Sequence, residues 1–275
     1  MTRALTRAVT TGLDRVRRDR NTGAVRDQEA GGTGREAWEP LEAAFASPAA
    51  KRRYNRRLFG IVAERYDLVT RVLSYGLDQR WKRRLVALAA VRPGERAYDL
   101  ACGTGDLARL VADRGAVVVG LDLAPRMLQQ ARAAARHGSL GVVAGDLMDL
   151  PFASASASLV TIGYGLRNAP VLGRALAEIH RVLVPGGRVL SLEFNRPTPR
   201  LVRAAYLGYL TAIGSMLGVV LHGDADTYRY IAASLRRYPG AAAVVEAFGA
   251  AGFVTARWVP LLGGLMGIHE ARKAG

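Results

Sequence analysis

The chain has 275 residues, half of them hydrophobic, so it can bury the core of one large domain. A single cysteine excludes an intrachain disulfide framework, and four scattered histidines show no metal-ligand spacing, so we expect no metal. The formal net charge is +16, mostly from arginine, which favours contact with an anionic membrane or nucleic acid unless the charge is merely solvated.

The first 50 residues differ in composition from the rest. Residues 1–20 carry apolar side chains at helical spacing among six arginines, which indicates a basic amphipathic surface helix, although a transit peptide has a similar composition. Residues 21–36 have little periodicity and are typical of a linker. We therefore predict a basic, disordered extension over residues 1–50, followed by one folded domain over residues 51–275.

The rest of the chain alternates short apolar runs with amphipathic segments. Residues 54–90 predict helices that cap a cleft. Strands are predicted over 97–100, 116–121, 141–144, 158–163 and 187–193, helices over 105–113, 125–136, 171–183 and 241–251, and closing strands over 253–259 and 264–271. This pattern is typical of an α/β fold with a mostly parallel, seven-stranded sheet and helices on both faces.

A Gly-rich turn follows the first predicted strand, and the second strand ends in a carboxylate. Residues 99–105 read Asp-Leu-Ala-Cys-Gly-Thr-Gly. Gly103 and Gly105 let the backbone approach a ligand closely, and the next helix offers free N–H groups. Asp122 lies 23 residues after Asp99, near the roughly 20-residue spacing that places a carboxylate on a ribose. The sequence therefore predicts a site for an adenosine-containing cofactor.

The identity of that cofactor depends on the acidic residues. Residues 103–108 also satisfy the dinucleotide pattern, which leaves NAD open. Asp99, however, would face a cationic ligand group and would repel a pyrophosphate. Asp146 ends a third strand, where it can meet an adenine, and a Pro-Gly-Gly turn at 185–187 precedes a further strand. Together these features resemble the Rossmann-like class I methyltransferases that use S-adenosylmethionine (SAM).

Seven further segments narrow the resemblance. They are 66–68, 73–77, 81–83, 164–168 (Tyr-Gly-Leu-Arg-Asn), 192–194, 224–231 (Asp-Ala-Asp-Thr-Tyr-Arg-Tyr-Ile) and 234–236. In this order and spacing, from Tyr54 to Lys273, they resemble the ubiquinone/menaquinone C-methyltransferase family, whose members methylate a ring carbon of a polyprenylated hydroquinone. The resemblance makes residues 51–275 a SAM-dependent methyltransferase domain, with a helical lid near 198–237.

The resemblance also assigns site residues. The cofactor-binding set is Asp99, Gly103, Thr104, Gly105, Asp122, Asp146, Leu147 and Gly163. Gly163 stands where related sequences often have serine, so a side-chain hydrogen bond is lost while the backbone can still contact SAM. Thr70 and Arg71 are a second departure, since the family usually has Asn followed by an acidic or polar residue, and this leaves the substrate's identity open.

Three residues after the fourth strand form the predicted catalytic set. Arg167 is predicted to stabilise a developing phenolate, although a structural ion pair with a neighbouring helix is the alternative. It is not a base, because a guanidinium stays protonated. Asn168 would orient the ring oxygen or a water, and Tyr164 would line the pocket or bond the hydroxyl. His269 is interpreted as structural, and the general base is not identified.

Residues 204–221 form a stretch without a charged side chain, and this stretch is long enough to span a membrane. Their Gly, Ser and Thr content and their place within the predicted domain favour a buried lid, or a wall that accepts the isoprenoid tail.

The predicted partners follow from the substrate. We expect a polyprenylated quinol, peripheral contact with a membrane surface at its cytoplasmic, inner face, and no nucleic acid, with a homodimer as an open possibility. The alternatives are a methyltransferase of another apolar phenol or polyketide, an NAD-binding dehydrogenase, and a non-catalytic membrane-associated subunit. The ring type and the tail length stay open.

Overall fold

A seven-stranded sheet organises the part of the chain that the structure, a computed structural model, describes: residues 40–135 and 140–275. The chain divides into two units, Met1–Trp38 and Glu39–Gly275, and only the second contains described residues. The helix and linker predicted before residue 37 therefore lie outside the described residues.

The strand order is β3-β2-β1-β4-β5-β7-β6. The strands are β1 (Arg96–Leu100), β2 (Val117–Asp122), β3 (Leu140–Ala144), β4 (Ala157–Gly163), β5 (Leu183–Phe194), β6 (Phe253–Leu261) and β7 (Met266–Lys273). The first five pair in parallel, whereas β7 runs antiparallel to both β5 and β6. The predicted α/β fold with seven strands is confirmed.

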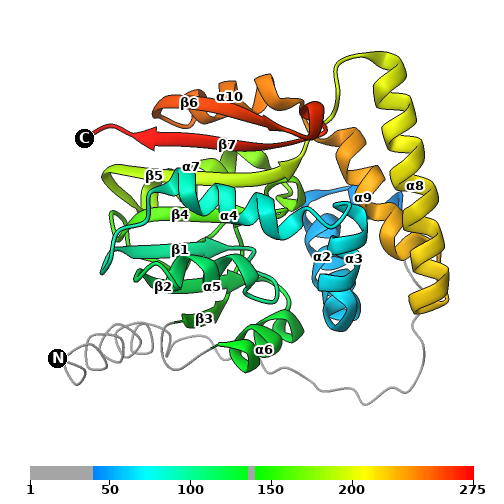
Figure 1. Cartoon of the computed structure of the whole chain (residues 1–275), viewed down its shortest axis with the longest axis horizontal. Coiled ribbons are helices and arrows are strands. Elements are labelled where there is room, and N and C mark those ends of the chain that lie inside the picture. Colours follow the sequence, from blue (N-terminus) through cyan, green and yellow to red (C-terminus); the bar gives the residue numbers. More distant parts are fainter. Residues whose placement is uncertain (1–39, 136–139) are drawn as a thin grey trace. The chain divides into compact units, whose positions relative to one another are not determined.

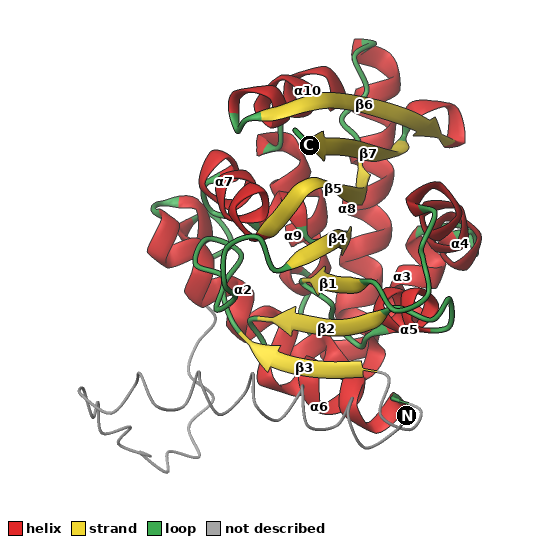
Figure 2. Cartoon of the chain, turned by 90° about the vertical axis from the view of Figure 1, so that its left-hand side faces the viewer, coloured by secondary structure: helices red, strands yellow, loops and turns green. Residues whose placement is uncertain are grey.

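Helices cover both faces of the sheet. The α-helices of the described residues are α2 (Pro48–Val62), α3 (Tyr66–Leu73), α4 (Asp78–Ala89), α5 (Asp106–Ala112), α6 (Pro125–Ala134), α7 (Leu172–Val182), α8 (Arg200–His222), α9 (Asp226–Arg237) and α10 (Ala241–Ala250). Figure 2 shows α4 and α5 on one face and α7 and α10 on the other. Because both faces are covered, the parallel strands are continuous apolar runs, as in β4.

The carboxyl ends of the parallel strands point toward a separate group of helices. Figure 1 shows α2, α3, α8 and α9 gathered beyond that end of the sheet. The helix α2 begins at a Ser47 cap followed by Pro48, both favoured at a helix start. Of these helices, α2, α3 and α9, together with the loops after β1, β2 and β4, line the cavities described below.

Two sequence predictions need correction. The folded domain begins before residue 51, because Leu41 and Ala44 are buried and the Phe45 ring stacks on Tyr230 at 5.8 Å. The predicted Pro-Gly-Gly turn is instead part of β5. There, Ala157 pairs with Leu183, yet the next paired residue of β5 is Arg188, so the segment between them bulges out of register.

The uncharged stretch 204–221 forms most of α8. Its Tyr206, Leu210, Gly214 and Gly218 are buried, but only 22% of the most apolar 18-residue window is buried. The prediction of a buried lid is therefore wrong. By length and composition, α8 is the one helix among the described residues that could cross a membrane.

Candidate active site

A cavity of about 630 Å³ lies over the carboxyl ends of β1, β2 and β4, and this volume, like those given below for the neighbouring cavities, includes space open to solvent. Among the predicted cofactor residues, those that line it are Gly103, Asp122, Asp146, Leu147 and Gly163. A smaller cavity of about 310 Å³ adjoins it at Tyr66, Gly103 and Tyr164, and it adds Asp99 and Thr104. The structure thus brings seven of the eight predicted residues together.

Gly105 lines neither cavity and shapes the turn instead. Its φ is +82°, and a Cβ there would lie 3.2 Å from the Ala131 Cβ. Because this left-handed conformation and close approach both favour glycine, Gly105 fixes the loop that carries Gly103 and Thr104.

Asp122 is held by the Gly-rich loop at the end of β2. Its Oδ2 accepts a hydrogen bond from Gly103 N, and its Oδ1 accepts one from Ala124 N, both at 2.9 Å. Burial raises its pKa, while these N–H donors oppose the shift. Each carboxylate oxygen keeps a second lone pair, so Asp122 can still accept ribose hydroxyls.

Asp99 has one carboxylate oxygen without a partner. Its Oδ1 accepts a hydrogen bond from Thr161 Oγ1 at 2.6 Å, whereas Oδ2 is buried and unpaired. Burial raises the pKa of Asp99 to about 7. An unpaired buried carboxylate oxygen beside a cavity calls for a cation, and the ammonium of SAM supplies one. The site therefore fits SAM and disfavours a pyrophosphate.

Lys82 faces the same small cavity, and its role was not predicted. It is buried on α4, with Nζ 2.9 Å from Asp78 Oδ2 and 3.3 Å from Asp106 Oδ2. The same cavity thus presents Lys82 with the carboxylates of Asp99 and Asp106, so both signs of charge that an amino-acid zwitterion needs lie there, with Lys82 already paired to Asp78 and Asp106. The signal in the sequence was a lone lysine among the arginines of the 80–84 cluster.

The helix α2 closes the side of the cavity that Asp146 lines. Asp146 accepts a hydrogen bond from Met148 N at 3.0 Å, and its Oδ2 lies 3.0 Å from Arg52 Nε. Arg52 also lines the cavity and was not predicted. The Asp146 carboxylate is therefore held from both sides.

Thr104, which is predicted to contact the cofactor, forms a hydrogen bond with a residue of α3. The Thr104 hydroxyl donates to Asp67 Oδ1 at 2.8 Å. Its proton is thus used within the protein, although its oxygen can still accept. Thr104 therefore links the cofactor loop to α3.

A second, mostly apolar cavity of about 490 Å³ adjoins the first. The two share Phe59, Tyr66 and Tyr164. Its other walls come from α2, α3, α9 and the end of β5, and none of its lining residues belongs to α8. This cavity therefore gives no support to the prediction that residues 204–221 form the tail wall.

Arg167 lines this second cavity and is buried. Its Nη1 donates to Glu193 Oε1 and to Tyr164 O, both at 2.7 Å, while its buried Nε has no partner. Burial alone would lower the pKa of Arg167, but the Glu193 carboxylate raises it above the usual value. The alternative of an ion pair is thus present, although its partner belongs to β5 and not to a helix. Because Nε takes no part in the ion pair with Glu193, its N–H remains available as a hydrogen-bond donor.

Tyr164 and Asn168 belong to the same loop. Tyr164 lines all three cavities, and its hydroxyl donates to Asp78 Oδ1 at 2.8 Å. Its ring thus serves as a wall, which was one of its two predicted roles. Asn168 donates to Tyr164 O at 3.2 Å and keeps Oδ1 unpaired. It lines the cofactor cavity, not the second one.

The helix α2 clamps this loop from outside. Lys51 Nζ donates to Arg167 O at 2.9 Å and to Ala169 O at 3.0 Å. Asn55 Nδ2 donates to Asn168 O at 2.9 Å. Tyr164 has φ +59°, a conformation that non-glycine residues rarely adopt, so the loop needs such support.

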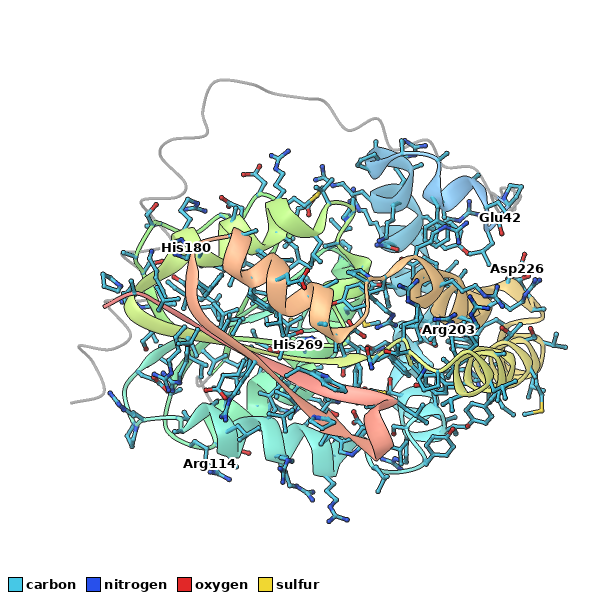
Figure 3. The ribbon with its side chains drawn as sticks, turned by 90° about the horizontal axis from the view of Figure 1, so that it is seen from above. Glu42, Arg114, His180, Arg203, Asp226 and His269 are labelled. Carbon is cyan, nitrogen blue, oxygen red and sulfur yellow. The ribbon has the colours of Figure 1, made fainter. Side chains whose placement is uncertain are left out.

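His269 lies away from the cavities. Figure 3 labels it beside α10, where its Nε2 is 3.3 Å from Ala241 O. It is buried, and burial lowers its pKa to about 4. Within 40–135 and 140–275, no group of three His, Cys, Asp or Glu side chains could hold a metal.

The sheet order and the two acidic residues at the ends of β1 and β2 define a class I, SAM-dependent methyltransferase. The chain belongs to the ubiE/COQ5 methyltransferase family, whose sequence profile matches residues 48–273.

Individual relatives agree with this assignment. The chain is 41% identical over 216 residues to the demethylmenaquinone methyltransferase of Thermus thermophilus, covering 77% of this chain and 98% of that protein. It is 40% identical over 225 residues to the ubiquinone/menaquinone biosynthesis C-methyltransferase UbiE of Teredinibacter turnerae, covering 79% and 90%. A crystal structure of a SAM-dependent methyltransferase from Methanococcus maripaludis matches with a TM-score of 0.56 at 15% identity, covering 89% and 98%, and supports the fold.

Proposed function

We propose that this methyltransferase methylates a ring carbon of a polyprenylated quinol. One observation carries the proposal: Arg167, whose buried Nε–H has no hydrogen-bond partner, lines an apolar cavity that shares Phe59 and Tyr66 with the cofactor cavity. A flat ring with one polar oxygen fits such a cavity. The names of the relatives, which act on quinone precursors, support the same acceptor class.

In this proposal, one cavity binds SAM and the second binds the acceptor. SAM supplies a methyl group on a sulfonium, which leaves readily. Asp99 and Lys82 would hold the zwitterion, Asp122 the ribose, and Asp146 the adenine. What remains for the protein is to orient the acceptor and exclude water, which can account for a large part of a rate enhancement.

Arg167 acts on the acceptor's ring oxygen. A neutral phenol has a pKa near 10, so donation from Nε–H and the guanidinium charge stabilise the phenolate character that makes the ring carbon nucleophilic. Arg167 is the only charged side chain among the described residues that line this cavity. Because no carboxylate or imidazole lines it there, we assign the proton that leaves the methylated ring carbon to solvent, after methyl transfer is complete.

The isoprenoid tail would extend along α3 and α9. Val69 and Leu73 of α3 and Ile231 of α9 line the cavity on that side. Burying each CH₂ contributes about 0.8 kcal/mol, so even one isoprene unit strengthens binding. We further propose that the protein reaches this tail by peripheral contact at the cytoplasmic face of a membrane.

Methyl-labelled SAM and two quinol classes test the proposal. The purified chain is incubated with tailed naphthoquinol or benzoquinol, and the product is mapped by mass spectrometry and NMR. We expect label on a ring carbon of at least one class. Label on oxygen, or turnover only with tail-less phenols, would favour the alternative of another phenolic acceptor.

A further inference from the structure

The outer face of α8 is apolar and exposed along its length. Leu201 is 86% and Val220 73% exposed, and Met216 and Val219 are more than half exposed. The intervening outward positions are Ala204, Ala205, Gly208 and Ala212. A face of this length without a charge is uncommon on a water-exposed helix.

The opposite face of α8 is fixed to the protein. A Cβ on Gly214 would lie 2.9 Å from Tyr228 O, and one on Gly218 would overlap Asp224 O. The helix thus packs backbone to backbone against α9 and the turn before it. Tyr206, near its start, donates to Leu265 O at 3.3 Å. Crossing a bilayer would separate α8 from these contacts, so only its outer face is free to meet another phase.

The helix α3 extends this apolar surface. The Tyr75 ring, just after α3, stacks on Tyr209 of α8 with centroids 5.3 Å apart. Leu68 and Val72 of α3 are 50% and 40% exposed. The other face of α3 lines the second cavity through Val69 and Leu73. The exposed surface and the cavity therefore share one helix as a wall.

Arginines flank the surface. Arg200 and Arg203 lie in the first turn of α8 (Arg203 is labelled in Figure 3), and Arg71 lies on the exposed side of α3. Arg236 of α9 reaches the side of α8, with Nη2 3.4 Å from Thr211 Oγ1. Apolar side chains ringed by cations complement an anionic lipid surface, with long arginine stems reaching the headgroups.

We propose that the outer face of α8, joined to Leu68, Val72 and Tyr75, docks the protein on an anionic membrane, lying in the interface without spanning it. This inference rests on the proposed function for its purpose, since a membrane-dissolved tail must reach the second cavity beside α3. A second copy of the chain is a poorer occupant, because two such faces would bring their arginines together in a chain of net charge +16.

Vesicle sedimentation of the full chain tests the docking surface. The test variant is Met216→Asp with Val220→Asp, and the matched control is Val254→Asp, a 63% exposed valine on β6. Binding is measured on vesicles that mix phosphatidylcholine with phosphatidylglycerol. We expect the double variant to lose about tenfold or more in vesicle partitioning, with the control unchanged. Leu201→Asp provides a second variant, and thermal melts confirm folding.

The outcomes of these experiments distinguish the proposed docking surface from the proposed methylation of a quinol. Turnover of a water-soluble, short-tailed quinol should be unchanged in the double variant, whereas turnover of long-tailed quinol in vesicles should fall. Wild-type partitioning by both α8 variants would overturn the docking surface. The docking surface would also be overturned if light scattering showed that the wild-type protein is a dimer and the variant a monomer, and neither bound vesicles. If no quinol is methylated while the partitioning loss persists, the proposed function fails and the docking surface stands.

Discussion

The Arg167 guanidinium lies 2.7 Å from the Glu193 carboxylate, and both side chains are buried. Glu193 Oε2 also accepts from Arg167 N at 3.1 Å, and its Oε1 accepts from Phe194 N at 2.9 Å. Glu193 therefore fixes both the backbone and the side chain of Arg167 while leaving Nε free. The pair holds in place a guanidinium that lines the second cavity.

Glu193→Gln should weaken both stability and turnover. Removing one partner of a buried ion pair typically lowers the free energy of unfolding by about 3–5 kcal/mol, because the other charge is left uncompensated. Urea unfolding measures this loss, with Glu270→Gln as control. The partner of Glu270, Arg257, is 64% exposed, so the control should lose less than about 1 kcal/mol. Equal losses in the two variants would contradict the buried orienting pair.

SAM affinity should rise with pH through Asp99. Burial raises the pKa of Asp99 to about 7 in the free, folded protein, whereas the unfolded chain has a value near 4. Ionisation of Asp99 therefore opposes folding, and the free energy of unfolding decreases as the pH rises from about 4 to 7. Only the ionised form attracts the ammonium. Calorimetry between about pH 5.5 and 7.5 should show affinity rising by up to tenfold per unit below 7. Asp99→Asn should bind more weakly and without this slope. A flat wild-type profile would remove Asp99 from the ammonium site.

Gly163→Ser should strengthen SAM binding. A Cβ there would lie 3.5 Å from Leu107 Cδ2, an ordinary contact, and Gly163 lines the cofactor cavity. One added hydrogen bond contributes about 0.5–1.5 kcal/mol, or roughly two- to thirteenfold in affinity. Gly165→Ala is the contrasting change, since its Cβ would lie 2.5 Å from the Ala101 Cβ. It should displace the loop and lower turnover. Weaker SAM binding by Gly163→Ser would contradict the cavity assignment.

Leu73→Asp should raise KM for a long-tailed quinol in detergent more than for a tail-less analogue. Leu73 lines the second cavity, and a carboxylate there disrupts contact with an apolar tail. Its neighbour Val72 faces outward, so Val72→Asp is the matched control and should leave both KM values unchanged in detergent. If Leu73→Asp affects both acceptors equally, the tail does not follow α3.

Much of the fold could be predicted because its signals are local. Alternating apolar runs specified the parallel strands, and the glycines and carboxylates at strand ends specified the cofactor cavity. Asp99 and Asp122 were found since their place after a strand decides where they lie in the fold.

The remaining features depend on contacts distant in sequence. Nothing near Arg52 or Lys51 indicates that α2 closes over Asp146 and the Arg167 loop. The stretch 204–221 was misinterpreted because an uncharged helix suits burial as well as exposure, and only the packing of Gly214 on α9 shows which face is covered. The partner of Arg167 likewise comes from β5, 26 residues further along the chain.

The central claim is that Arg167 stabilises the acceptor's phenolate, and single-turnover methyl transfer to a tailed quinol tests it most directly. With SAM saturating, Arg167→Ala should slow the transfer on the order of 10²-fold, typical of losing one electrostatic stabiliser. Arg167→Lys keeps the charge without the Nε–H and should recover only part of the rate. SAM affinity should stay near the wild-type value in both. A wild-type transfer rate in a folded Arg167→Ala protein with lowered thermal stability would reduce Arg167 to a structural ion pair and contradict the account.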